Sequence, residues 1–459
     1  MKKILSAIAL LLTTVSITAS NYTKHYEGLP IELKQAVTPT ISDRRVTITD
    51  YGAVGDGQTL CTTAIQQAID NLSAQGGGHV DVPAGIWLTA PFILKSGIDL
   101  HLAQNAIIQL TEDRSMHIKP GQKKAISAIT AAKAHDISIT GQGIIDGNGE
   151  FWRAVKKGKQ SDVEWREYLA LGGNVTEKGD LWYPFNLKHQ GNIAPTREQQ
   201  EKMRSNMIRF TDCQRVMVQG VTLQNSPKFH LTPTDCQDVI IDGVTIRCPW
   251  NAQNGDAIDI GTCQRVLIIN NTIDCGDDGI CMKGAVGDES LNHKPCEDIL
   301  IKHNTVFHGH GGFVIGSEFC AGMYKIVVCH NTFSGTDTGL RFKSAIGRGG
   351  KTGDIYCYNI NMTDIKGEAI VFETTYADKA VSGTTGPATG TKWVPEFKDI
   401  NIYNIICNSA KTGIKAKGAK GMVHDINISN STIFYTHTAT DIDTTCDIKT
   451  KDVKLITYK

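Results

Sequence analysis

Short runs of β-branched residues recur along most of this chain. Each run is followed by a turn at Gly or Asn and then by a second short run. The first β-branched residue of each copy gives a series of anchors spaced by 23 to 45 residues: Val216, Val239, Val266, Ile299, Ile326, Ile355, Ile400 and Ile426. An earlier copy begins near Ile137. Each unit therefore predicts short strands separated by turns, and no helix.

A unit of this size cannot bury its own apolar face, so neighbouring units must stack to form a continuous core. The pattern predicts an all-β fold, a right-handed parallel β-helix in which every strand pairs with its equivalent one coil away, at about 4.8 Å. A β-propeller is the competing interpretation, but its blades need roughly 40–50 residues and four strands each. The absence of a helical pattern argues against leucine-rich and helical repeats.

An open coil exposes strand edges and needs covers at its ends. Residues 62–72 carry apolar side chains at helical spacing, which predicts a short N-terminal cap helix that ends at Gly76. We expect the first coils at 80–145 and one β-helix domain over 46–459. An inserted loop region at about 150–205 interrupts the repeat. Its aromatic residues either pack locally or contact substrate: Trp152, Trp165, Tyr168, Trp182 and Tyr183.

The N-terminus reads as an export signal. Residues 1–20 begin with Lys2 and Lys3, continue with a short apolar run and end in small residues. Residues 21–45 are a lead segment before the repeat. We expect a protein exported to the periplasm or the extracellular space, and no further segment is typical of a membrane span. The sequence does not indicate an oligomeric state.

Charge and cysteine content narrow the function classes. Lys plus Arg number 47 and Asp plus Glu number 47, so no net basic field is available for nucleic acid or a membrane surface. The 13 cysteines are an odd number, and several fall at one repeated position. Buried single thiols are the favoured interpretation for most of them, and no spacing typical of a zinc site occurs.

Polar clusters follow the strands of four consecutive units: Asn254-Gly255-Asp256, Gly276-Asp277-Asp278-Gly279, Gly309-His310-Gly311 and Arg341-Phe342-Lys343. Asp277 and His310 each lie 11 residues after their anchors, so we expect them side by side on adjacent coils. Asp256 lies 17 residues after its anchor, and a longer turn must bring it back. Any one cluster alone is more typical of a turn, but four in order on stacked units favour a site.

The residue types suit glycoside cleavage. One carboxyl group must be protonated to hand a proton to the leaving oxygen, and another must be ionised to activate water. Crowded carboxylates raise one another's pKa, so the three aspartates supply both states. On a strand, Arg341 and Lys343 point to one side and Phe342 to the other. The two cations either neutralise the acids or bind an anionic sugar.

With these clusters the chain resembles the polygalacturonase family of glycoside hydrolases, family 28, from about residue 45 to 440. The family motifs Asn-Thr-Asp, Gly-Asp-Asp, Gly-His-Gly and Arg-Ile-Lys are similar to the four clusters. The stretches 50–57 and 225–227 also resemble family signatures. Gly255 and Phe342 depart from the motifs at non-catalytic positions. The stretch 309–318 is more similar to bacterial exo-acting members than to fungal endo-acting ones.

The resemblance implies an exported polygalacturonase that hydrolyses α-1,4-galacturonosyl links in pectin with inversion, and it favours an exo-acting enzyme. It implies that Asp277 is the general acid, that Asp256 and Asp278 activate the water, and that His310 assists the acid. Arg341 and Lys343 would hold a galacturonate carboxylate. Three further residues are candidates for substrate binding: Asn254, Glu318 and Tyr376. No cofactor and no metal are implied.

Two other interpretations stay open at this point. A pectate lyase shares the fold class but uses calcium and a cationic base. A β-helix that binds carbohydrate without cleaving it would not need the acid trio. The partner expected in every case is a pectic polysaccharide or oligogalacturonide.

Overall fold

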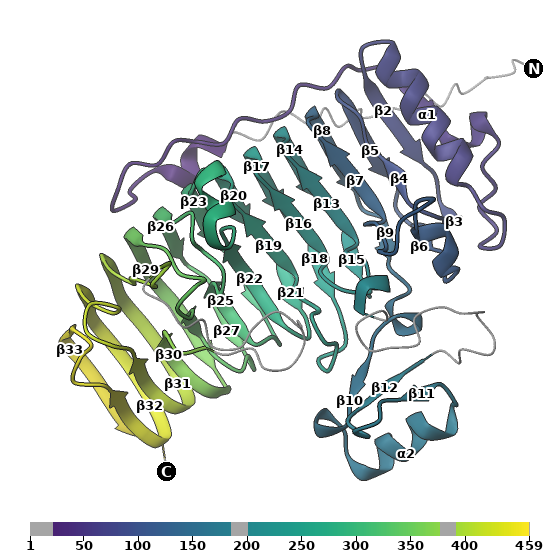
Figure 1. The fold of residues 1–459 in the computed structure, drawn as a ribbon. Coiled ribbons are helices and arrows are strands. Elements are labelled where there is room, and N and C mark those ends of the chain that lie inside the picture. Colours follow the sequence, from purple (N-terminus) through teal and green to yellow (C-terminus); the bar gives the residue numbers. More distant parts are fainter. Residues whose placement is uncertain (1–21, 185–200, 377–391, 459) are drawn as a thin grey trace, which may run out of the picture.

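The computed structural model describes residues 22–184, 201–376 and 392–458. Short strands stack in parallel along one long body, and a helix covers the end that carries the first coils (Figure 1). Every pairing within this stack is parallel, and each strand pairs with its equivalent in the next coil. The predicted all-β parallel β-helix is confirmed.

Three faces make up each coil. Face 1 begins with β1 (Arg45–Thr47) and continues through β2 (Gly78–Val82), β5 (Ile98–Leu102), β8 (His135–Gly141), β14 (Gln214–Gln219), β17 (Gln237–Asp242), β20 (Gln264–Ile269), β23 (Cys296–Lys302), β26 (Met323–Cys329), β29 (Thr352–Thr363), β31 (Ile400–Lys417), β32 (Ile426–Ile442) and β33 (Ile448–Thr457).

Face 2 consists of β3 (Gly85–Thr89), β6 (Ala106–Leu110), β9 (Ile144–Asp146), β15 (Thr222–Gln224), β18 (Thr245–Arg247), β21 (Thr272–Asp274), β24 (Thr305–Val306) and β27 (Thr332–Ser334). Face 3 consists of β4 (Phe92–Ile93), β7 (Ile129–Ala132), β13 (Ile208–Thr211), β16 (Leu231–Thr234), β19 (Ile258–Gly261), β22 (Asp278–Lys283), β25 (Gly311–Ile315), β28 (Leu340–Lys343) and β30 (Ile365–Glu373). The long strand β29 runs on from face 1 onto face 2, and β31 runs from face 1 over face 2 onto face 3.

The repeat anchors set the register of face 1. Val216 pairs with Val239, Val239 with Val266, and Val266 with Ile299. The series continues through the remaining anchors as far as Ile426. Inward β-branched side chains at these positions are fully buried, so each coil buries the apolar face of its neighbour.

The N-terminal cap is α1 (Thr62–Ala74), which confirms the predicted helix with two more residues at its C-terminal end. Its apolar face is buried on the first coils: Ala64, Ile65, Ala68, Ile69 and Leu72. Short 3₁₀ turns lie at Tyr22–Tyr26, Ile48–Tyr51, Arg114–His117, Gly149–Phe151, Lys157–Lys159 and Gly287–Asn292.

The lead segment runs along the outside of the stack (Figure 1). Tyr22 and Leu33 are buried against outward apolar residues of face 1, among them Leu267 and Leu300. Backbone N–H groups of this segment donate to aspartates on two face 1 strands, β8 and β17: Thr40 to Asp136 at 2.9 Å and Val37 to Asp238 at 3.2 Å. The segment is therefore part of the folded body. The predicted signal, residues 1–20, lies outside the described residues.

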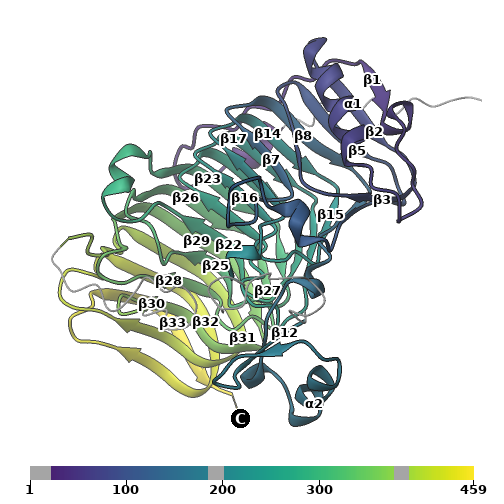
Figure 2. The same cartoon turned by 45° about the vertical axis from the view of Figure 1, so that its right-hand side comes forward.

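The inserted region contains more structure than a loop. It forms β10 (Val155–Lys156), α2 (Asp162–Ala170), β11 (Asn174–Val175) and β12 (Leu181–Tyr183), and its small sheet is antiparallel. Figures 1 and 2 show this unit projecting from one side of the stack. Ser161 and Glu164 form a capping box at the start of α2, a signal that the sequence carries. Trp152, Trp165 and Trp182 are buried, which favours local packing.

The thirteen cysteines all lie in the described residues and are unbonded; all are buried except Cys446, which is half-buried. This agrees with the interpretation of most of them as small apolar groups. Within the described ranges, no helix is long and apolar enough to cross a membrane.

Candidate active site

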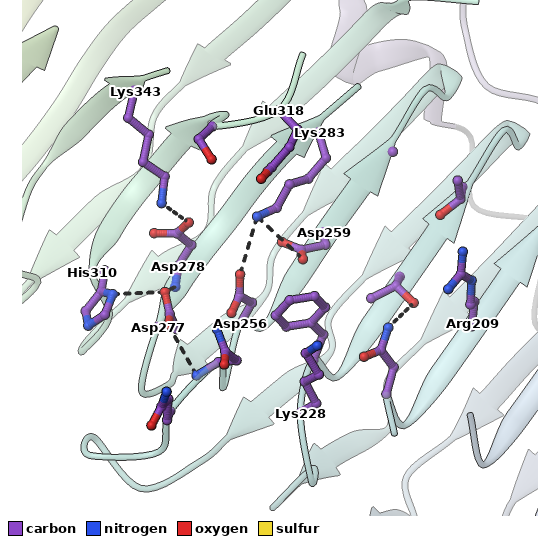
Figure 3. A pocket seen from close by; sticks show the side chains of 18 of the residues that line it. Arg209, Lys228, Asp256, Asp259, Asp277, Asp278, Lys283, His310, Glu318 and Lys343 are labelled. Atoms are coloured by element: carbon purple, nitrogen blue, oxygen red, sulfur yellow. Dashed lines mark hydrogen bonds and ion pairs between the residues drawn. The ribbon is translucent and has the colours of Figure 1, made fainter. Parts of the chain in front are cut away.

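The four polar clusters meet on face 3. Asp277 ends the turn before β22, and His310 ends the turn before β25. Because Asp278 pairs with Gly311 in these parallel strands, Asp277 and His310 lie opposite each other. The His310 Nδ1 is 2.9 Å from Asp277 Oδ1 (Figure 3). The structure thus confirms the side-by-side placement that equal spacing predicts.

Asp256 reaches the same place by a turn between β18 and β19. Ile258 pairs with Ile280, so Asp256 lies opposite Asp278, one coil away. The backbone closes this contact, because the Ala257 N–H donates to the Asp278 carbonyl at 3.0 Å. The longer turn therefore brings the third aspartate beside the other two, and Asp256 is only 3% exposed.

Asp278 is held by both predicted cations. Lys343 Nζ lies 2.8 Å from Asp278 Oδ2, and Arg341 Nη1 lies 3.3 Å from Asp278 Oδ1. Phe342, between the two cations, points inward and stacks on Phe372 with ring centroids 4.6 Å apart. Burial acts to raise the pKa of Asp278, but Lys343, Arg341 and Lys283 together outweigh it, and the pKa lies below the usual range. Asp278 is therefore ionised in the free site.

Asp277 also accepts several hydrogen bonds. Its Oδ1 accepts from the backbone N–H of Asp278 at 3.0 Å, and its Oδ2 accepts from that of Asn254 at 3.2 Å. Burial favours the neutral carboxyl, but the adjacent His310, together with Lys343 and Lys283, outweighs burial and lowers the pKa of Asp277.

Asp256 has a poorer environment. Its Oδ1 is buried without a hydrogen-bond partner, and its Oδ2 lies 3.7 Å from Lys283 Nζ. Burial, together with the neighbouring Asp277, raises the pKa of Asp256 well above its ordinary value. Of the three aspartates, Asp256 is therefore the one that holds a proton most tightly in the free site.

The other predicted residues lie around this group. Tyr376 faces the two cations, with Lys343 Nζ 5.1 Å and Arg341 Cζ 5.6 Å from its ring centroid. Glu318 lies in the same cavity and pairs with Arg348 at 3.5 Å. Burial acts to raise the pKa of Glu318, but the nearby cations, among them Lys283 and Arg348, outweigh burial, and the pKa is lowered. The side-chain oxygen of Asn254 accepts from Arg204 at 2.9 Å, so Asn254 both lines the cavity and holds the catalytic turn.

Several residues of the site escaped the sequence reasoning. Lys283 Nζ lies between Asp256 and Asp259, 3.7 and 4.0 Å away. Burial raises the pKa of Asp259 to about 6. Strand alternation could have found both residues, because Asp259 and Lys283 stand at outward positions of β19 and β22, as Arg341 and Lys343 do on β28.

The inserted unit also reaches the site. Lys159 Nζ lies 3.3 Å from His310 Nε2 and 3.4 Å from the Gly276 carbonyl. Lys156 of β10 lines the same cavity. No periodicity marks these two lysines, since they lie outside the repeat.

These side chains line a cavity of about 460 Å³ on the outer surface of face 3. Asp277, Asp278 and His310 have potential metal-ligand atoms within 4.8 Å of one another. A divalent ion there would compete with Lys343 and Arg341 for Asp278, which already has two cationic partners. Acids in two protonation states beside a cavity are the requirement for acid/base cleavage of a glycosidic bond.

A parallel β-helix with a carboxylate group of this kind defines a class of glycan-cleaving enzymes. Residues 168–454 match the model of "Glycosyl hydrolases family 28", and the chain belongs to this family. It is 30% identical over 390 residues to the exo-poly-α-D-galacturonosidase of Dickeya chrysanthemi. The aligned region covers 80% of this chain and 63% of that enzyme. The chain therefore spans less than two thirds of that relative's length.

Other relatives match over more of their length. An endo-polygalacturonase of Pectobacterium carotovorum is 25% identical over 86% of this chain and 88% of its own. The crystal structure of a hyperthermoactive exopolygalacturonase from Thermotoga maritima has a TM-score of 0.71 at 26% identity, over 92% of this chain and 94% of that one. The predicted resemblance, the fold class and the enzyme class, a glycoside hydrolase of the polygalacturonase family, are confirmed.

Proposed function

We propose that this chain hydrolyses α-1,4-galacturonosyl links in pectin and acts from a chain end. The observation that carries the proposal is the buried group Asp256, Asp277 and Asp278, whose members lie in one cavity but in unlike electrostatic environments. Such a division of pKa values supplies an acid and a base at one pH. The cations beside Asp278 suit a substrate that carries carboxylates.

In this proposal Asp277 protonates the leaving oxygen, and Asp256 and Asp278 activate the attacking water. His310 positions Asp277 through the 2.9 Å contact. Asp256 holds a proton more tightly than Asp277 does in the free site, so a proton must reach Asp277 before the bond breaks. A substrate carboxylate bound by Arg341 and Lys343 would partly neutralise the cations that keep the aspartates ionised. Its negative charge would also raise the pKa of the aspartates nearby, because a like charge disfavours the ionised form.

Two observations support action from a chain end. The relatives from Dickeya and Thermotoga carry names of exo-acting enzymes. In addition, the inserted unit places Lys156 in the cavity lining and Lys159 3.3 Å from His310, so it stands at one side of the catalytic group. Secretion remains a prediction from residues 1–20.

Product analysis on polygalacturonate tests this function. One small product from the start of the reaction indicates exo action, and a ladder of products indicates endo action. An unsaturated product that disappears when calcium is chelated would identify a lyase instead.

The Asp277→Asn variant tests the catalytic assignment. We expect hydrolysis to fall by roughly 10²- to 10⁴-fold, because general acid catalysis contributes that much, while the variant still binds oligogalacturonate. Asp354→Asn, at an exposed position of β29 outside the cavity lining, is the matched control. Equal behaviour of the two variants would mean a protein that only binds glycans.

A further inference from the structure

The cavity on face 3 holds two groups of cations that differ in their partners. Arg341 and Lys343 are already paired with Asp278. Arg209 and Lys228 lie on the other side of Asp256 (Figure 3), and neither forms an ion pair with any residue that the structure describes. Cations left unpaired beside a cavity indicate an anion that the free protein lacks.

The register places Arg209 in a continuous outward row. Arg209 pairs with Thr232 on the next strand, and Thr232 is level with Asp259, since Leu231 pairs with Ile258. The row continues through Cys281 and Val314 to Arg341. Strands in a sheet lie about 4.8 Å apart, so Arg209 stands ~10 Å beyond the strand of Asp259. A polymer that crosses the strands at the catalytic group can therefore reach it.

Small residues form the sheet surface between Arg209 and Asp259. The outward positions of β16 and β19 between these two residues are Thr232, Thr234 and Gly261, which have a short side chain or none. Phe229 stands beside this surface, and its ring centroid lies 5.1 Å from Lys228 Nζ and 5.7 Å from Lys283 Nζ. We call the part of the cavity formed by Arg209, Lys228, Phe229, Thr232 and Thr234 the distal groove. Aromatic rings beside polar side chains are suited to a sugar ring.

The environment of Lys228 disfavours its charged form when no anion is bound. It is half-buried, and burial, together with the nearby Arg204, lowers its pKa. A bound carboxylate would raise the pKa of Lys228 again and so offset both effects, because an opposite charge favours the ammonium form. Arg209 is exposed, and its guanidinium can bind a carboxylate through two hydrogen bonds.

The geometry points to a second uronate-binding subsite in the distal groove, in which Arg209 and Lys228 bind carboxylates of sugar residues beyond the one next to the scissile bond. This inference rests on the proposed function, since it assigns the same acidic polymer a longer path over face 3. It makes the enzyme selective for chains long enough to reach β13.

Chain-length kinetics test the subsite. We expect kcat/KM of the wild type to rise when oligogalacturonates become long enough to enter the distal groove. The variants Arg209→Gln and Lys228→Met should lose about tenfold or more of kcat/KM on long substrates, as expected for a charge-assisted hydrogen bond. They should match the wild type on the shortest substrate that is cut. Arg209→Lys and Lys228→Arg, which keep the charge, should retain most of the rise.

The control is Lys411→Gln, an exposed cation outside the cavity lining. Equal losses at every chain length, or no loss at any, would overturn the subsite. Thermal unfolding of each variant shows whether it is folded.

A binding experiment separates this inference from the proposed function. Titration calorimetry compares an oligogalacturonate with a neutral galactose oligomer of the same length. If the wild type cuts no galacturonan but binds the acidic oligomer through Arg209 and Lys228, the proposed hydrolysis fails and the subsite stands. If both variants bind the acidic oligomer as the wild type does, the subsite fails even though hydrolysis is observed.

Discussion

Asp256 and Asp278 are the same residue type, lie opposite each other on adjacent coils and are both buried. Their partners differ. Asp278 has Lys343 at 2.8 Å and Arg341 at 3.3 Å, whereas Asp256 has one cation at 3.7 Å and one oxygen without a partner. The pKa of Asp278 is lowered and that of Asp256 is raised. The comparison teaches that distance to a counter-charge, rather than depth of burial, decides which aspartate is ionised.

We expect the largest change in the pKa difference between Asp256 and Asp278 when Lys343, the nearer of the two cations beside Asp278, is removed. Lys343→Met leaves a buried carboxylate with Arg341 alone, and breaking a buried ion pair costs about 3–5 kcal/mol of stability. We expect a loss of this size in the free energy of unfolding at neutral pH, measured by urea denaturation, and a strong loss of hydrolysis.

The control is Lys415→Met. Lys415 pairs with Glu368 at 3.0 Å in the neighbouring β30 and β31, but both side chains are partly exposed. A pair of this kind contributes about 0–1 kcal/mol. The double variant Lys343→Met/Asp278→Asn should lose less than the sum of the two single losses, because the partners are coupled. Simple additivity would show that the pair does not set the state of Asp278.

Replacing each aspartate by Asn should change stability in opposite directions. The raised pKa of Asp256 means that the folded protein holds this proton more tightly than the unfolded chain does. Its stability therefore falls as pH rises above the unfolded value of about 4. Asp256→Asn removes that loss, so we expect it to be more stable than the wild type at pH 7, with the gain vanishing at about pH 4 and below.

Asp278 has the opposite sign. Its lowered pKa means that its ionisation stabilises the fold above the unfolded pKa, and this contribution is lost only as pH falls through the lower, folded value. Asp278→Asn should therefore be less stable at pH 7 and remain so at pH 4. Each unit of pKa displacement corresponds to about 1.4 kcal/mol. Thermal unfolding of both variants across pH 3–8 is the measurement, and losses of equal sign would contradict the division of charge.

The sequence predicts the parts of this site that repeat. The anchors at 216, 239 and 266 set the register that the structure shows, and equal offsets place Asp277 beside His310. Lys283 and Asp259 lie within the same repeat and follow from strand alternation, but neither belongs to a recognisable motif. The position of Asp256 depends on the path of an irregular turn, which spacing alone does not fix. Which aspartate carries the proton depends on distances of 2.8 and 3.7 Å that no sequence pattern contains.

Lys159 is the residue that the sequence could not indicate, and it offers the mildest test of the comparison. It comes from outside the repeat and touches His310, which in turn holds Asp277. Its ammonium donates to Nε2, so it favours the ring tautomer whose Nδ1–H points at Asp277. We expect Lys159→Met to lower kcat by about fivefold, the value of one hydrogen bond of ~1 kcal/mol, with KM unchanged. Lys159→Arg should restore part of the rate.

Lys157→Met is the matched control, since Lys157 lies in the same 3₁₀ turn but stands over the Trp165 ring at 6.0 Å. This variant should keep its kcat. If Lys159→Met instead raises KM and leaves kcat alone, Lys159 binds substrate directly. The orientation of Asp277 would then depend on the stacked coils alone, and the inserted unit would line the cavity without acting on the acid.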